Sequence, residues 1–238
     1  FPELVAYYPF NGNANDESGN GYNGTVSGAT LTTDRFGNTN NAYSFNGSSD
    51  FIDINQASTL NLPEYTYSAW IYPTAYPAGI NGQTAMGTIL DIGGNLADQF
   101  MALHNYHPWV GLGASGYYIG GGTYNLWTGT LPALNQWYQV AVTRSSTGYK
   151  FFINGELSQT MSLSAAGPDY HNPIFGFIGK RIGDLQYFTG KIDDIRIYNN
   201  PKTDAQVQQL YNNESSGLVA YYPFNGNAND ESGNGRNG

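Results

Sequence analysis

An internal repeat without a mismatch limits what this chain can fold into more than any other feature of its sequence. Residues 4–21 read LVAYYPFNGNANDESGNG, and the same string returns at residues 218–235. A repeat of this kind indicates one structural unit followed by the opening of another. We therefore predict a domain at residues 1–212, a polar linker at 213–217, and at 218–238 the duplicated start of a second unit, either a strand for exchange or a truncated repeat.

Short runs of alternating apolar and polar residues fill the region between the two copies and predict β-strands. Asn-Gly and Gly-Gly pairs, which favour tight turns, separate many of them. No amphipathic helical pattern lies between the runs, so the sequence predicts an all-β fold, a two-sheet antiparallel sandwich. The expected strands are 42–45, 51–54, 65–72, 88–92, 100–103, 137–143, 149–154, 174–178 and 191–198. Residues 111–122 are rich in glycine and indicate long loops or an inserted hairpin.

One short helix is expected after Pro201. Thr203 and Gln206 have the spacing of a capping box, in which each side chain bonds the backbone of the other residue. Val207, Leu210 and Tyr211 then fall on one face of the helix. The predicted helix would close the first unit.

The charge balance excludes several classes of function. The chain has 9 basic and 18 acidic residues, for a net charge of −9, which repels a nucleic-acid backbone. No apolar run approaches the roughly 18 residues of a membrane span. The sequence has no cysteine, which excludes disulfide and thiol chemistry.

Several segments, in order along the chain, carry a resemblance to a known family. They are LVAYYPFNGNANDESGNGYNGTVSGA, AYSFNGSSDFIDI, YSAWIYP, NQWYQVAVTRS, YKFFINGELS and GKIDDIRIYNNPKTDAQVQQLY. They resemble the successive signatures of laminin-G-like jelly-roll domains of the concanavalin-A-like superfamily, bacterial extracellular type. The resemblance implies stacked antiparallel sheets, adjacent terminal strands, an extracellular or cell-surface location and often a bound Ca²⁺. It leaves function open, because the superfamily includes lectins, adhesion modules and glycosidases.

A structural Ca²⁺ is expected near the start of the chain. Residues 11–16 place amide oxygens at alternate positions before the carboxylate of Asp16, a donor set that suits a hard cation. The segment is no EF-hand, because Asp16 stands where that loop requires glycine. The resemblance implies ligands from Asp16, from backbone carbonyls between Ser18 and Gly21, and from the pair Asp193 and Asp194. Asn and Asp that simply form turns are the alternative.

Strand parity gives a second reason to expect a cation. Asp193 is two residues from Ile195 and four from Ile197, so alternation predicts that its side chain points into the core. An unpaired carboxylate there would be costly, and a cation would neutralise it. Asp50 and Asp53 are possible neighbours of such a site.

An aromatic and histidine-rich stretch is the predicted ligand-binding region. Tyr106, His107, Trp109 and Tyr118 could stack on sugar rings and bond their hydroxyls. The alternative is a hairpin whose rings pack on the sheet.

Catalysis is not expected. The E-x-D-x-x-E carboxylate cluster of glycosidases with this fold is missing, and Asp193 and Asp194, adjacent in a strand, should face opposite sides. H-E-x-x-H and G-x-S-x-G are also missing.

The sequence therefore favours a non-catalytic extracellular structural or adhesive module, stabilised by Ca²⁺ and used in tandem or as a self-assembling, fibre-like subunit. The alternative is a carbohydrate-binding module with a glycan partner. For assembly we expect pairing with an exposed sheet edge by the strand that contains Leu218, Ala220, Tyr222 and Phe224.

Overall fold

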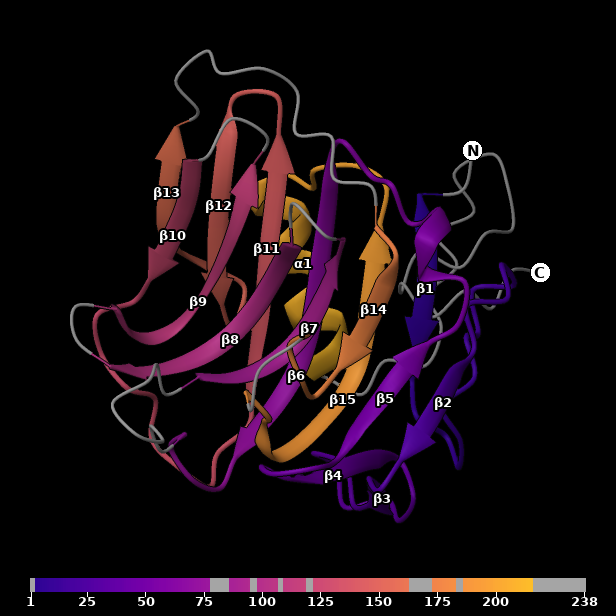
Figure 1. Ribbon diagram of the computed structural model, residues 1–238. Coiled ribbons are helices and arrows are strands. Elements are labelled where there is room, and N and C mark those ends of the chain that lie inside the picture. Colours follow the sequence, from indigo (N-terminus) through magenta and orange to yellow (C-terminus); the bar gives the residue numbers. More distant parts are fainter. Residues whose placement is uncertain are drawn as a thin grey trace.

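Two antiparallel sheets stack face to face, and strands that are far apart in the sequence lie side by side within each (Figure 1). The computed structural model describes residues 3–77, 86–94, 98–106, 109–118, 122–162, 173–182 and 186–215. Within them, sheet A has the order β13-β12-β11-β6-β15-β4-β3, with β1 also paired to β15, and sheet B has the order β10-β9-β8-β7-β14-β5-β2. The predicted all-β sandwich is confirmed.

The elements follow the chain with short turns between many of them. The strands are β1 (Leu4–Tyr8), β2 (Gly24–Ser27), β3 (Thr30–Thr32), β4 (Ala42–Asn46), β5 (Phe51–Ile54), β6 (Tyr65–Pro73), β7 (Met86–Gly93), β8 (Asp98–Tyr106), β9 (Trp109–Tyr118), β10 (Gly122–Trp127), β11 (Tyr138–Ser145), β12 (Gly148–Ile153), β13 (Glu156–Ser162), β14 (Phe175–Ile178) and β15 (Thr189–Tyr198); the helical elements are the 3₁₀ turn η1 (Ala57–Thr59) and the helix α1 (Asp204–Ser215).

The nine predicted strands correspond to β4, β5, β6, β7, β8, β11, β12, β14 and β15. Within the glycine-rich residues 111–122, Tyr118 of β9 pairs with Gly122 of the antiparallel strand β10. The hairpin interpretation of that stretch is therefore the right one. The expected neighbouring of terminal strands is also confirmed, because Leu4 of β1 pairs with Tyr198 of β15.

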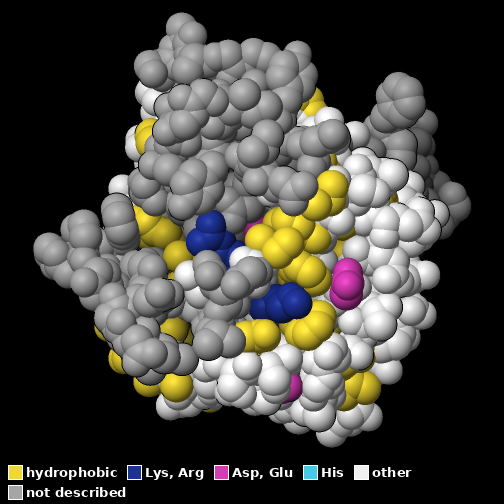
Figure 2. Space-filling view, viewed as in Figure 1, with side chains coloured by type: hydrophobic (Ala, Val, Ile, Leu, Met, Phe, Trp, Pro, Cys, Tyr) yellow, Lys and Arg dark blue, Asp and Glu magenta, His cyan; other side chains and the backbone are white. Residues whose placement is uncertain are grey.

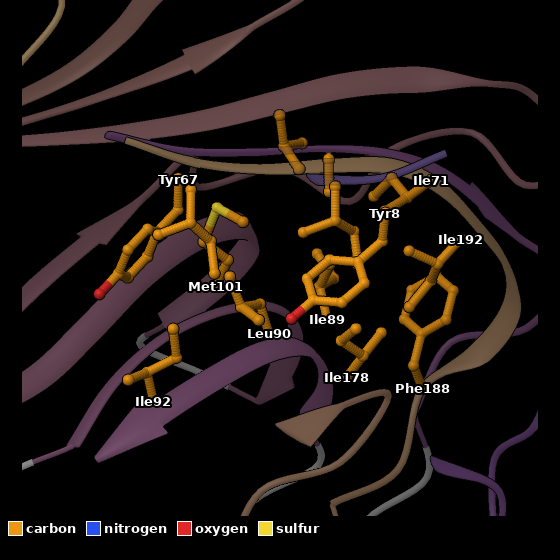
Figure 3. Packing of buried hydrophobic residues seen from close by; sticks show 14 of the residues in the cluster. Tyr8, Tyr67, Ile71, Ile89, Leu90, Ile92, Met101, Ile178, Phe188 and Ile192 are labelled. Carbon is orange, nitrogen blue, oxygen red and sulfur yellow. The ribbon is translucent and has the colours of Figure 1, made fainter. Parts of the chain in front are cut away.

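The core lies between the two sheets and is built from the inward-facing residue of each alternating pair (Figure 3). Tyr8 and Ile71 from sheet A meet Ile89 and Met101 from sheet B, and all four side chains are fully buried. Since alternate residues of a strand face opposite sides, each strand that fills the core also presents a second row of side chains outside the sandwich. Those two outer faces carry the features of interest.

Helix α1 begins with the predicted capping box. The Thr203 N–H donates to Oε1 of Gln206, 2.9 Å away, and the Gln206 N–H donates to Oγ1 of Thr203 at 3.3 Å. The helix continues to Ser215, so the linker predicted at 213–217 begins too early. Glu214 is buried against sheet A, and this contact extends the helix past the polar stretch that suggested a linker. None of the helical segments in the described chain has the length and apolar character needed to span a bilayer.

Candidate functional site

The outer face of sheet A is covered by the chain itself. Val207 of α1 packs on Ala141 of β11 and Phe152 of β12. The ring of Tyr211 stacks on Trp70 of β6 with centroids 5.7 Å apart. In Figure 1 the helix lies behind sheet A, on the side away from sheet B. The rings and apolar side chains under α1 are therefore used to hold the helix.

A buried ionic cluster lies beneath the end of α1. Arg196 of β15, 1% exposed, forms an ion pair with Glu214 of the helix. The other carboxylate oxygen of Glu214 accepts a hydrogen bond from Nε1 of Trp70 at 2.6 Å. Arg196 also lies 3.5 Å from Asp194. The cluster ties the end of the helix to the middle of sheet A.

Arg35, from the turn after β3, completes the cluster. Its guanidinium donates to Asp193 at 2.8 Å and to Asp194 at 2.6 Å, and it lies 4.5 Å from the ring centroid of Trp70. A cation therefore neutralises Asp193, as its burial required, and that cation is an arginine of the same chain.

The strand-parity argument for Asp193 was wrong, and a β-bulge is the reason. The pairing of β15 with β6 shifts between Asp193 and Arg196, and Asp194 has a φ of 46°. The bulge inserts one residue, so Ile192, Ile195 and Ile197 face the core while Asp193 faces outward under Arg35. It also turns both acids toward one guanidinium, whereas simple alternation placed them on opposite sides.

Burial and charge act on the three carboxyl groups in different directions. Burial, together with the charge of Asp194, raises the pKa of Asp193 well above its ordinary value despite Arg35. Burial acts in the same direction on Asp194, but Arg196 and Arg35 outweigh it and hold the pKa of Asp194 below the ordinary value. Burial also raises the pKa of Glu214, against the effect of Arg196. The cluster is thus a set of mutually dependent charges.

Asp16, the first predicted calcium ligand, is surrounded by hydrogen-bond donors. Its carboxylate accepts from the backbone N–H groups of Tyr7 at 2.9 Å, Ser18 at 2.9 Å and Tyr22 at 3.0 Å. The hydroxyl of Ser18 donates to it at 2.9 Å. Gly21, another predicted ligand position, has a φ of 84° and allows the loop to turn back on the carboxylate. These contacts match the alternative interpretation of the segment as a turn.

The residues present do not fit a calcium site well. Four donors already occupy the Asp16 carboxylate, and Asp193 and Asp194 are bonded by Arg35. Tyr7 separates the two groups, since its N–H bonds Asp16 and its hydroxyl donates to Asp194 at 2.9 Å. Among the described residues no group of three His, Cys, Asp or Glu is arranged to hold a metal. Calcium stays a prediction from the resemblance.

The outer face of sheet B, in contrast, presents half-buried aromatic rings. Leu126 of β10 faces the core, so the next residue, Trp127, faces outward, where it packs on Met86 and Ala102. The indole also lies over Gly113 of β9, where an added Cβ would come within 2.6 Å of the ring. Trp127 as a whole is half-buried, and its Nε1 is buried.

A second aromatic group lies on the same face at the β14–β5 end. The rings of Phe51 and Phe177 meet edge to face with centroids 5.8 Å apart, and Phe175 stacks on Phe177 at 5.4 Å. Lys180 places its Nζ 3.6 Å from the Phe51 centroid and 4.0 Å from that of Phe177. Figure 2 shows Lys and Arg side chains lying among hydrophobic ones in the middle of this face.

The predicted ligand residues belong to the same sheet. Tyr106 pairs with Trp109 at the β8–β9 turn, and Tyr118 ends β9. His107 lies outside the described residues, as do Leu218, Ala220, Tyr222 and Phe224. Phe51, Phe177 and Lys180 were not predicted as ligand residues from the sequence. The alternation in β5 could have indicated Phe51, because Ile52 and Ile54 occupy the inward positions and Phe51 therefore occupies an outward position.

A groove lies on the outer side of sheet A. It has a volume of about 670 Å³ between β11–β13 and the start of α1. Hydroxyl side chains line much of it, together with Lys150 and Asp204, which form an ion pair 2.6 Å long. Its one aromatic lining residue, Tyr149, is 1% exposed. The groove therefore offers no ring on which a ligand could stack.

Comparisons with known proteins agree with this architecture. The sequence model of the family described as "Concanavalin A-like lectin/glucanases superfamily" matches residues 46–208. A search of curated protein sequences finds no match. Domain 4 of AbnA, a GH43 extracellular arabinanase from Geobacillus stearothermophilus solved with arabinotriose, has a TM-score of 0.67 and 20% identity, over 87% of this chain and 97% of that one.

Two further solved structures share the fold. The binding domain of Paraclostridial Mosquitocidal Protein 1 has a TM-score of 0.71 and 16% identity, over 92% of this chain and 53% of that one. Trypanosoma rangeli sialidase has a TM-score of 0.62 and 15% identity, over 90% of this chain and 33% of that one. The chain thus spans about half of the toxin domain and a third of the sialidase. At these identities the likeness establishes the fold alone.

Proposed function

Because the chain belongs to the concanavalin A-like lectin/glucanases superfamily, we propose that it is a non-catalytic carbohydrate-binding module whose ligand lies across the outer face of sheet B. The observation that carries the proposal is the half-buried Trp127, whose indole lies over Gly113. An aromatic ring fixed on a rigid sheet and accessible on one side is suited to stacking on the apolar face of a sugar ring.

The distribution of rings across the sheet suggests a ligand of more than one sugar. Trp127 is on β10 at one edge, and Phe177 is on β14, four strands away in the sheet order. At about 4.8 Å per strand, the two lie roughly 20 Å apart along the sheet. A short oligosaccharide could contact both. The arabinanase domain solved with arabinotriose and the toxin binding domain support a binding role of this kind.

Three of the buried carboxylates are bonded to arginines of the same chain. Asp193, Asp194 and Glu214 are bonded by Arg35 and Arg196 under the helix, on the opposite side of the sandwich from Trp127. This arrangement supports a module without catalysis. The family also supports an extracellular location, which we include in the proposal.

Binding to saccharides tests the proposal. We expect an immobilised panel of oligosaccharides that includes arabinotriose to retain the protein. We expect Trp127→Ala to weaken the best interaction by roughly fivefold to a hundredfold, on the scale of the about 1–3 kcal/mol that a base stacked on one aromatic ring contributes. Trp137→Ala is the matched control, since Trp137 is a half-buried tryptophan that packs on Tyr72 of sheet A. Retention of no saccharide, or equal losses in the two variants, would contradict the proposal.

We also propose that residues 218–235 mediate contact between units by strand exchange. The residues that hold β1 in place recur in the second copy, with Tyr221 in the position of Tyr7 and Asp230 in that of Asp16. The free side of β1 is closed by its own loop, because the Glu17 N–H donates to the Tyr7 carbonyl at 2.8 Å and the Ser18 hydroxyl to the Val5 carbonyl at 2.9 Å. A second copy is thus better suited to replace β1 in another unit than to add beside it.

Deleting residues 217–238 tests this assembly. We expect the shortened chain to fold and to remain monomeric at concentrations where the full chain associates, as measured by light scattering. Association of equal strength in both chains would show that the second copy plays no part.

A further inference from the structure

Lys180 lies two residues after the end of β14 and extends over two aromatic rings. Its Nζ is 3.6 Å from the ring centroid of Phe51 and 4.0 Å from that of Phe177, which are cation–π distances. The two rings come from neighbouring strands, β5 and β14, and are held edge to face. The ammonium group is therefore fixed at one place on the exposed outer face of sheet B.

The other described lysines find oxygen partners, whereas Lys180 does not. Lys150 pairs with Asp204, Lys202 pairs with Glu3 and Lys191 donates to Thr33. For Lys180, no carboxylate or other oxygen of the described residues lies within bonding distance, and its contacts are the two rings. An ammonium has three N–H donors, and aromatic faces accept none of them in a normal hydrogen bond.

Partial burial of the Lys180 cation costs free energy in the unbound protein, and a bound anion would recover it. Burial lowers the pKa of Lys180, and the nearby charge of Asp53 opposes that effect only in part. Asp53 is exposed on β5, directly opposite Phe177. A partly desolvated cation without a bonded acid gains free energy when an anion binds to it.

We propose that Lys180 binds the carboxylate of an acidic sugar residue, in a saccharide whose apolar ring face lies on Phe51 and Phe177. The inference rests on the proposed function and adds the class of sugar. In a chain whose net charge of −9 disfavours anions overall, a fixed cation on the binding face favours an acidic ligand at this place.

A matched pair of ligands isolates the carboxylate. Trigalacturonic acid and its trimethyl ester have the same rings and differ in charge, and titration calorimetry measures both. We expect the acid to bind at least tenfold more tightly than the ester, as a charge-assisted hydrogen bond in a partly desolvated place provides. Lys180→Met should remove the preference, and Lys180→Arg should retain much of it.

Two further variants separate a binding role from a structural one. Asp53→Asn removes the negative charge beside Lys180 and should strengthen binding of the acid by a few-fold, a gain that no loss of folding could imitate. Lys150→Met, on the outer face of sheet A, should leave both affinities unchanged. Equal binding of acid and ester, or a preference that survives Lys180→Met, would overturn the inference and leave the carbohydrate-binding proposal standing. If both probes and every neutral oligosaccharide fail to bind, both proposals are wrong.

Discussion

The outer faces of the two sheets carry similar residues in opposite situations. On sheet A, Trp70 and Arg196 are 5% and 1% exposed, and α1 covers them with a stacked ring and a carboxylate. On sheet B, Trp127 and Lys180 are half-buried, and no helix of the described chain covers them. An aromatic ring or a cation outside the sandwich therefore stabilises the fold where the chain provides its partner. Lys180, whose contacts in the described chain are two aromatic rings, remains available to a ligand.

The largest expected effect tests the covered face. Arg196→Met leaves Asp194 and Glu214 buried with fewer positive partners, so we expect a loss of about 3–5 kcal/mol in the free energy of unfolding, measured with urea. Lys150→Met breaks an ion pair whose side chains are 43% and 49% exposed, and should cost less than about 1 kcal/mol. Similar losses in both variants would show that the buried cluster contributes no more than a surface pair.

The pH dependence of the stability also tests how much the buried cluster contributes. Folding lowers the pKa of Asp194, so the stability that its charge contributes is present above the ordinary value of 3.8 and is lost as the pH falls through the lowered one. The pKa values of Asp193 and Glu214 are raised, so their ionisation costs stability, and that cost disappears with acid. We expect Asp194→Asn to lose about 2 kcal/mol at neutral pH.

The difference between the wild type and Asp194→Asn should shrink below pH 3.8. Urea unfolding at a series of pH values measures it. Of the groups around Asp194, Arg196 and Tyr7 have raised pKa values and keep their protons in that acid range, while Asp193 and Glu214, whose pKa values are also raised, take up theirs at higher pH. A difference that stays constant down to pH 2 would mean that the Asp194 charge contributes nothing.

A smaller effect is expected on the uncovered face. A Cβ at Gly113 would come within 1.9 Å of the Leu126 carbonyl oxygen and 2.6 Å of the Trp127 ring. Gly113→Ala should therefore displace the indole and cost about 1–2 kcal/mol of stability, while saccharide binding falls at least as far as in Trp127→Ala. Gly129→Ala is the control, although its φ of 76° adds strain, because nothing lies within 4 Å of its Cβ position. Unchanged binding in Gly113→Ala would separate the indole from the ligand.

The regular parts of the fold could be predicted from local patterns. In β5 the inward Ile52 and Ile54 alternate with Phe51 and Asp53, and such a pattern contains both the strand and its orientation. The bulge at Asp194 could not be predicted this way. Its positive φ is maintained by contacts with Arg35 and Tyr7, which are 159 and 187 residues away in sequence.

The candidate binding face was predicted only in part for the same reason. Alternation indicates that Phe51 and Phe177 are outward residues, but their meeting depends on the order of strands in sheet B. Lys180 follows β14, and its cation–π contacts depend on where those two rings lie. The sequence did predict a ligand-binding region on β8 and β9 of the same sheet, at Tyr106, Trp109 and Tyr118.

The last expected effect concerns Asp16, where a bound calcium ion and hydrogen bonds from the chain predict opposite responses to Ca²⁺ and EDTA. A calcium ion that binds only the folded protein would add about 2.7 kcal/mol at a hundredfold excess over its dissociation constant, and EDTA would remove that stability. The four donors around Asp16 instead make the carboxylate an acceptor within its own loop. On that basis Asp16→Asn should lower the melting temperature by a few degrees, since each charge-assisted bond contributes roughly 1.5 kcal/mol or more, whereas Ca²⁺ and EDTA should leave it unchanged.

Asp204→Asn, at an exposed ion pair, is the control. A melting temperature that rises with millimolar Ca²⁺ and falls with EDTA, and that loses both responses in Asp16→Asn, would establish the calcium site and show that the donors rearrange around the ion.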